Sequence, residues 1–225
     1  MEYRIEGDSL PVVRFQLERG DELISEAGGR TWSLGPVKTE AASHGGVGGA
    51  LGRMFSGESL FLSHYEAEGP CEIGFASGLP GCIKAIDLEA GQSVIAQKGA
   101  FLCGTGSISL ATHFQKKIGS GLFAGEGFIL QKVTGPGTAF FEIDGHAVVY
   151  ELEAGEKIHM DTGVLAIMDE TCSVDIVRVK GMKNIFFGGE GLFDTVVSGP
   201  GKVYIQSMPV AQLVKALVPF LPKSD

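Results

Sequence analysis

An internal repeat constrains this chain more than any other feature. A glycine, a glutamate and a mostly apolar run occur three times, as the strings GESLFL, GEGFIL and GEGLFD, which begin at Gly57, Gly125 and Gly189. The last two copies are followed by Gly-Pro-Gly and the first by Gly-Pro-Cys. A signature that recurs in this way indicates a fold built by duplication.

A second signature gives nearly the same period. The pattern Leu-Glu-x-Gly ends at Gly20, Gly91 and Gly155, at steps of 71 and 64 residues, while the Gly-Glu signature recurs at steps of 68 and 64. Two independent motifs thus repeat in one order and at one spacing. The sequence therefore predicts a single compact unit, 1–225, made of three tandem repeats near residues 1–78, 79–143 and 144–207.

Alternating hydrophobicity predicts that these repeats consist of β-strands. Val13, Phe15 and Leu17 alternate with polar residues before the turn at Gly20, and a similar alternation precedes Gly155. The chain has 34 glycines in 225 residues, about twice the usual share of roughly 7%. This excess favours many tight turns between short strands.

The Gly-Pro-Gly triplets predict hairpin turns. Proline fixes φ at the second position of a turn, and glycine can adopt the positive φ that a type II turn needs at the third. Type II turns are therefore expected at two triplets, Gly135-Pro136-Gly137 and Gly199-Pro200-Gly201. In the first repeat Cys71 replaces the last glycine, so a different turn is expected there.

Only the C-terminal segment has a helical pattern. Pro209 is typical of a first helical turn, and apolar residues with helical spacing follow it. We expect a short helix over 208–221 that packs on its own β core. A subunit contact is the second interpretation and a membrane-surface contact the least favoured, because only Lys215 and Lys223 are basic there.

Charge and cysteine usage bear on partners and compartment. The formal net charge is -9, and an acidic surface repels phosphate backbones, so no general nucleic-acid binding is expected. The four cysteines include no C-x-x-C pair, which favours reduced thiols. The N-terminus resembles no signal peptide, and no apolar run reaches the roughly 18 residues of a membrane helix. We therefore expect a cytoplasmic protein.

No motif predicts a catalytic, cofactor-binding or metal-binding residue. The glycine-rich stretch 44–53 lacks the Gly-Lys-Ser/Thr ending of a phosphate loop, and neither H-x-H nor G-x-S-x-G occurs. The nearest metal-like group is His64 with Glu66 and Glu68, for which a solvated edge strand is the preferred interpretation. The sequence thus favours a protein that is not an enzyme and needs no cofactor.

One acidic residue stands at an equivalent place in each repeat: Glu58, Glu126 and Glu190. If the repeats pack about a common axis, these carboxylates form a symmetric ring that could bind a cation or raise one another's pKa. The preferred interpretation is that each glutamate accepts hydrogen bonds from the backbone of its own turn.

Four stretches of the sequence are familiar as a set: residues 49–62, 122–128, 130–137 and 206–209. Together they resemble the mitochondrial-biogenesis, altered-inheritance-of-mitochondria family. It spans the whole chain in order and departs at Arg19, where the family favours proline, and at Cys71. Bacterial members are described as a domain of unknown function, and no catalytic residues are carried over.

The resemblance implies a fold more than an activity. It implies double-stranded β-helix or β-sandwich units, similar to the tryptophan RNA-binding attenuation protein, around a pseudo-threefold axis. Mitochondrial members are associated with inner-membrane organisation, but this sequence shows no transit peptide, so only the domain carries over.

We therefore expect an all-β protein with a short C-terminal helix that acts as a non-enzymatic assembly or scaffold protein and forms a homo-oligomer. The alternative is a small-ligand binding module that uses clefts between repeats. RNA or membrane-surface binding is a lesser alternative.

Overall fold

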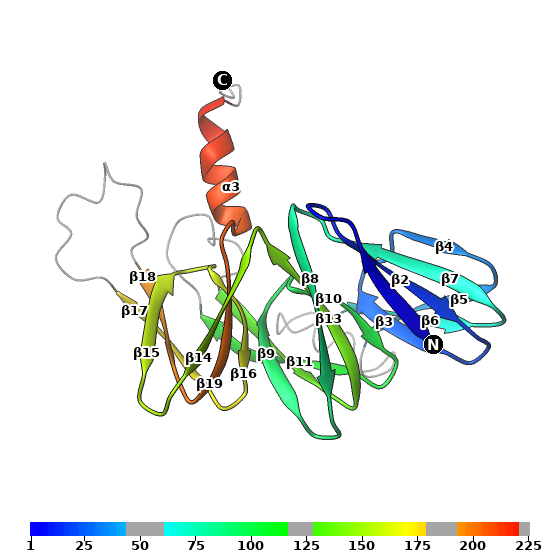
Figure 1. Cartoon of the computed structure of the whole chain (residues 1–225), viewed down its shortest axis with the longest axis horizontal. Coiled ribbons are helices and arrows are strands. Elements are labelled where there is room, and N and C mark those ends of the chain that lie inside the picture. The colour runs from blue at the N-terminus through cyan, green and yellow to red at the C-terminus, as the bar shows by residue number, and fades with distance from the viewer. Residues whose placement is uncertain (44–60, 117–127, 179–192, 221–225) are drawn as a thin grey trace.

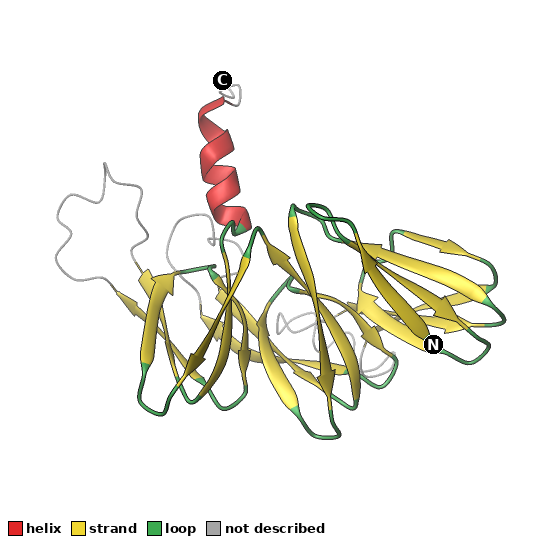
Figure 2. Cartoon of the chain, in the orientation of Figure 1, coloured by secondary structure: helices red, strands yellow, loops and turns green. Residues whose placement is uncertain are grey.

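The computed structural model describes residues 1–43, 61–116, 128–178 and 193–220. Within these ranges the regular secondary structure is almost entirely strand, with one short α-helix and one 3-10 turn near the C-terminus (Figure 2). The predicted all-β class is confirmed.

The strands after β1 (Glu2–Glu6) fall into three groups of six, which we call units 1, 2 and 3. Unit 1 comprises β2 (Val12–Leu17), β3 (Glu22–Glu26), β4 (Trp32–Leu34), β5 (Val37–Ser43), β6 (Phe61–Ala67) and β7 (Cys71–Ala76). Unit 2 comprises β8 (Gly81–Leu88), β9 (Ser93–Gln97), β10 (Phe101–Thr105), β11 (Ser109–Lys116), β12 (Phe128–Thr134) and β13 (Gly137–Asp144). Unit 3 comprises β14 (Ala147–Leu152), β15 (Lys157–Asp161), β16 (Leu165–Asp169), β17 (Ser173–Arg178), β18 (Phe193–Ser198) and β19 (Gly201–Gln206).

One antiparallel pairing scheme holds inside all three units. The sixth strand pairs with the first and the third, as β7 does with β2 and β4. The fifth strand pairs with the second and the fourth, as β6 does with β3 and β5. This scheme agrees with a triplicated unit, although the number of repeats and their boundaries stay predictions.

The sheets run across the boundaries between units. The second strand of one unit pairs with the third strand of the next, as β3 with β10 and β9 with β16. The result is two six-stranded sheets, β5-β6-β3-β10-β13-β8 and β11-β12-β9-β16-β19-β14. A four-stranded sheet, β1-β2-β7-β4, and a three-stranded sheet, β15-β18-β17, end the row.

The units follow one another in a row, with β4 at the right-hand end of Figure 1 and β15 at the left. A pseudo-threefold axis would bring these two strands together. Among the described strands, β4 pairs only with β7, and β15 only with β18. The pseudo-threefold arrangement is therefore wrong: each unit extends its neighbour's sheet sideways, so the row stays open.

The core also crosses unit boundaries. Phe15 of β2 and Phe140 of β13 are both fully buried, and their ring centroids lie 5.1 Å apart in an edge-to-face arrangement. Phe75 of β7 packs on Phe15 in the same way at 5.9 Å. Because apolar burial stabilises the fold by about 25 cal/mol per Å², this shared cluster ties unit 1 to unit 2.

The Leu-Glu-x-Gly turns use the conformational freedom of glycine. Gly20, Gly91 and Gly155 have φ values of +88°, +80° and +88°. No heavy atom lies within 4 Å of a Cβ built at any of them. Backbone conformation rather than space therefore favours glycine there.

The Gly-Pro-Gly turns differ from the expected geometry. The bonds Gly135–Pro136 and Gly199–Pro200 are cis, and the following Gly137 and Gly201 have φ of +138° and +141°. A type II turn has a φ near +80° at that glycine. The type II prediction is therefore wrong. The hairpin prediction is wrong too, because the strands that flank each triplet lie in different sheets: β12 does not pair with β13, and β18 does not pair with β19.

The C-terminal helix, α3 (Val210–Leu217), continues into the 3-10 turn η1 (Val218–Phe220). It stands out from the sheets (Figure 1), and Leu217 and Phe220 are 51% and 85% exposed. The expected packing of this helix on its own β core is thus wrong over the described residues, since only its first turn borders the sheets. No helix in the described ranges has the length and apolar character needed to cross a membrane.

Candidate functional site

The predicted acidic set lies outside the described residues. Glu58, Glu126 and Glu190 all fall in the ranges 44–60, 117–127 and 179–192. The symmetric acidic ring stays a prediction, and so does its alternative.

The histidine and glutamates considered for a metal lie beside a lysine. His64 and Glu66 share one face of β6, while Glu68 follows the end of the strand. Lys38 Nζ lies 2.9 Å from a carboxylate oxygen of Glu40 and 3.6 Å from one of Glu66. The hydrogen bond and charge of Lys38 lower the pKa of Glu40. Lys38 thus supplies positive charge to the carboxylates of Glu40 and Glu66. Within the described ranges no three His, Cys, Asp or Glu residues are grouped in a way that could hold a metal ion.

The thiols are in poor positions for nucleophilic chemistry. None of the four cysteines is in a disulfide, and Cys71, Cys103 and Cys172 are buried. Burial raises the pKa of all three thiols above the ordinary value. A raised pKa lowers the thiolate fraction at neutral pH, and the thiolate is the reactive form.

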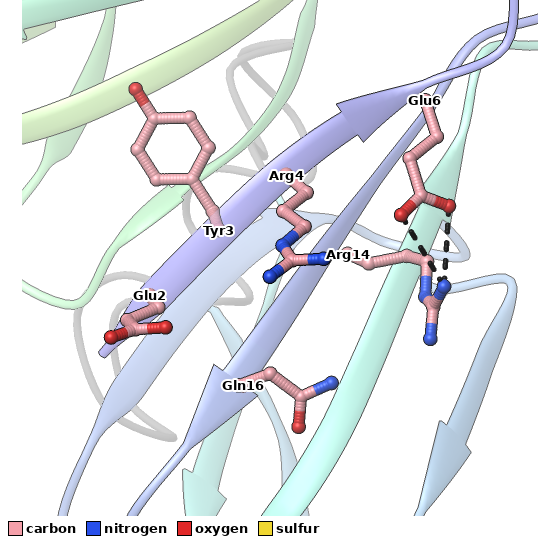
Figure 3. A pocket seen from close by; sticks show the side chains of 6 residues that line it. All are labelled: Glu2, Tyr3, Arg4, Glu6, Arg14 and Gln16. Atoms are coloured by element: carbon pink, nitrogen blue, oxygen red, sulfur yellow. Dashed lines mark hydrogen bonds and ion pairs between the residues drawn. The ribbon is translucent and has the colours of Figure 1, made fainter.

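A shallow groove of about 270 Å³ crosses the neighbouring strands β1 and β2 (Figure 3). Its charged side chains are two arginines and two glutamates, Arg4, Arg14, Glu2 and Glu6. Arg14 is held by ion pairs to Glu6 at 3.2 Å and to Glu72 at 2.6 Å. The groove is therefore a charge-balanced, open surface.

A larger cleft, about 410 Å³, lies where units 2 and 3 meet and where α3 begins. Its polar lining comes from strand ends and turns: Gln97, Lys98, Glu142, Asp144 and Gln206. Glu142 accepts hydrogen bonds from the Gly78 backbone N–H at 2.8 Å and from Ser77 Oγ at 3.0 Å. A carboxylate fixed in this way presents a polar wall to a small molecule.

Asp144 is the most perturbed acid of that cleft. Burial is the larger cause and the charge of Glu142 the smaller, and together they raise its pKa to about 6. Its backbone N–H donates to Gln206 Oε1 at 3.1 Å, while Gln206 Nε2 donates to the Gly163 carbonyl at 2.7 Å. Gln206 thus links the backbone of Asp144 to the turn between β15 and β16.

The two ends of the row are the features that sequence reasoning missed. At one end, β4 holds the only tryptophan of the chain, Trp32, which is half-buried, while Leu34 is 72% exposed. Trp32 Nε1 donates to Glu72 at 3.1 Å, and Glu72 also accepts from Arg14 and Gln16. These bonds lower the pKa of Glu72 to about 2, with the Arg14 hydrogen bond as the largest cause. Trp32 is therefore anchored at an edge strand.

At the other end, β15 is more exposed than its counterparts. The central residues of β3 and β9 are buried by the strands that pair with them, whereas His159 is exposed and Ile158 only half-buried. A signal for this was present in the sequence. Four residues after the Leu-Glu-x-Gly glycine, units 1 and 2 have Ile24 and Ile95, and unit 3 has His159.

The described geometry defines an all-β protein with sheets that cross unit boundaries, shallow polar clefts and an open row of units that ends at β4 and β15. The family assignment agrees with this class. The chain belongs to the mitochondrial biogenesis AIM24 family, whose model matches residues 3–208.

Two bacterial relatives resemble the chain over nearly its full length. An uncharacterized protein of Streptococcus pyogenes serotype M6 is 30% identical over 223 residues, which is 96% of this chain and 88% of that protein. The X-ray crystal structure of a Streptococcus pyogenes protein has a TM-score of 0.80 at 25% identity and covers 98% of this chain and 99% of its own. The second comparison shows that the chain shares its fold with that protein.

Proposed function

We propose that this protein is a non-enzymatic assembly protein of the cytoplasm that works as a homo-oligomer. The observation that supports the proposal is the open row of sheets, whose end strands β4 and β15 each pair along one edge alone among the described strands. Exposed strand edges present unpaired N–H and C=O groups, and these promote pairing with another chain. The four cysteines, none in a disulfide, fit a reducing compartment.

The test is the mass of the protein in solution. Light scattering coupled to size exclusion, run across the micromolar range, should give masses above the 23.7 kDa of one chain and rising with concentration. A mass that stays at one chain throughout this range would contradict the proposal.

The second candidate is a small-ligand binding module, supported by the cleft of about 410 Å³ between units 2 and 3. A ligand that binds only the folded state raises the melting temperature. A thermal-shift screen of amino acids and small metabolites should then give a hit that Glu142→Gln weakens and that Glu66→Gln, a matched change on a distant strand, leaves unchanged. The candidate fails if no compound raises the melting temperature.

A further inference from the structure

The two inner junctions between units have one register. In the first, Cys103, Gly104 and Thr105 of β10 lie opposite Ser25, Ile24 and Leu23 of β3. In the second, Ile167, Met168 and Asp169 of β16 lie opposite Ala96, Ile95 and Val94 of β9. In the first junction Cys103, four places after Gly99, faces Ser25, five places after Gly20. In the second, Ile167, four places after Gly163, faces Ala96, five places after Gly91.

At the ends of the row, the strands equivalent to these make only one of the two pairings among the described strands. β4 pairs only with β7, whereas its counterparts β10 and β16 have a second partner in the preceding unit; β15 pairs only with β18, whereas β3 and β9 have a second partner in the following unit. The equivalent inner strands show how pairing on both edges buries a strand. Leu23, Ile24 and Ser25 of β3 are fully buried, whereas β15 is exposed at three of its five residues. Each end thus carries one half of a junction that the chain builds twice internally.

We infer that copies of this chain join head to tail, with β15 of one copy pairing antiparallel with β4 of the next in the register of the inner junctions. This inference rests on the proposed function and names the partner as a second copy of the chain. Trp32 lies four places after Gly28, and Met160 lies five places after Gly155. The register therefore sets three pairs: Trp32 with Met160, Ser33 with His159, and Leu34 with Ile158.

The side chains match in this register. Residues directly opposite in an antiparallel pair share a face of the sheet, and next-but-one residues along a strand share it too. The apolar Trp32 and Leu34 therefore meet the apolar Met160 and Ile158 on one face, and the polar Ser33 meets His159 on the other. Leu34, 72% exposed in the single chain, gains an apolar neighbour.

The joined sheet continues the existing design. Its strand order would be β17-β18-β15 from one copy and β4-β7-β2-β1 from the next, which follows the order of the two inner sheets. The short length of β4 is no obstacle, because each inner junction also registers three residue pairs. Since the two edges differ, the contact is heterologous, and copies continue to add until a ring closes or a filament grows.

The experiment places one charge at each end. Leu34→Glu blocks the β4 end and Ile158→Glu blocks the β15 end, so each variant alone should remain at the mass of one chain by light scattering. Mixed in equal amounts, they retain one intact β15 and one intact β4 between them. The mixture should therefore form a complex of two copies and stop there. Leu10→Glu, at a residue that is 58% exposed away from both ends, should assemble like the parent.

Trp32 gives a second measurement, because it is the only tryptophan and lies in the joined edge. Its emission should shift to shorter wavelength as the parent assembles, and should not change with concentration in Leu34→Glu. Circular dichroism should show that both variants keep the parent's fold.

The outcomes separate this inference from the proposed function. A parent that assembles while either variant assembles equally well overturns the β4–β15 contact and leaves an assembly protein that uses another surface. A mixture of folded variants that stays at one chain also overturns it. A parent that is monomeric throughout overturns both.

Discussion

The inner junctions and the outer ends of this molecule are built from equivalent strands in different surroundings. At the inner junctions β10 and β16 are buried over four residues each, whereas β4 has no fully buried residue. The same secondary structure is thus core in the middle of the row and surface at its ends. The position of a strand in the row, rather than the strand itself, decides whether the N–H and C=O groups along its edge are paired.

The largest effect should come from the first inner junction. Phe140→Ala empties a fully buried site that is shared between units 1 and 2. It should lower the free energy of unfolding by about 3–5 kcal/mol, the usual cost of truncating a buried phenylalanine. Urea denaturation of the parent and the variant in dilute solution measures this. A loss below about 1 kcal/mol would show that the packing of Phe140 does not hold units 1 and 2 together.

The second inner junction should show a pH-dependent effect. The pKa of Asp144 is raised to about 6 in the folded protein, against about 3.9 unfolded. Folding therefore favours the protonated form, and stability is lost as the pH rises through about 6 and the buried carboxyl ionises.

Asp144→Asn should accordingly be more stable than the parent at pH 8, by about 1–2 kcal/mol after discounting for partial exposure. The gain should shrink as the pH falls and vanish at about pH 3 and below, where Asp144 is largely protonated in both states. Thermal unfolding across this pH range tests it. An equal gain in stability at high and at low pH would show that the effect of the substitution does not come from the ionisation of Asp144.

A smaller effect is expected at the β4 end. Glu72 binds Trp32, Arg14 and Gln16, but the network lies near the surface, so Glu72→Gln should cost about 1 kcal/mol at pH 7. The pKa of Glu72 is lowered to about 2, so its contribution is present at neutral pH and is lost as the pH falls toward 2. The difference between parent and variant, measured by Trp32 fluorescence during denaturation, should therefore shrink in acid and be greatest above about pH 5.

The smallest effect should come from Leu34→Ala. In a single chain this side chain is 72% exposed, so its removal should change stability by less than about 0.5 kcal/mol. Unfolding must be measured at a concentration at which the parent is monomeric, because association adds apparent stability. A large loss under that condition would mean that β4 is buried by its own chain and that the contrast with the inner junctions is false.

Local features were largely predictable. The alternation Val13, Phe15, Leu17 forms β2, with all three side chains buried, because a period of two reports the two faces of a strand. The C-terminal helix was placed correctly from its spacing. The turn type at Gly135 and Gly199 was wrong, because composition permits a proline turn without fixing whether the bond before the proline is cis or trans.

Pairing between distant strands was not predictable. The contact between β3 and β10 joins Ile24 to Gly104, and no local pattern records which strand will cover an edge. For the same reason the sequence suggested clefts between repeats without predicting that Asp144 and Gln206 line one, since the lining comes from strand ends far apart in the sequence. The acidic set Glu58, Glu126 and Glu190 lies outside the described residues, so it remains a prediction from the repeat alone.

The sequence by itself determined the strand-rich class, the places where glycine turns interrupt it and the spacing of equivalent positions, because each depends on residues close together in the chain. Only the tertiary structure decided that the sheets pass from one unit to the next, that the row stays open and that β4 and β15 end it. Strand edges carry unsatisfied hydrogen-bonding groups whatever their side chains, so only the three-dimensional arrangement determines which edges are covered.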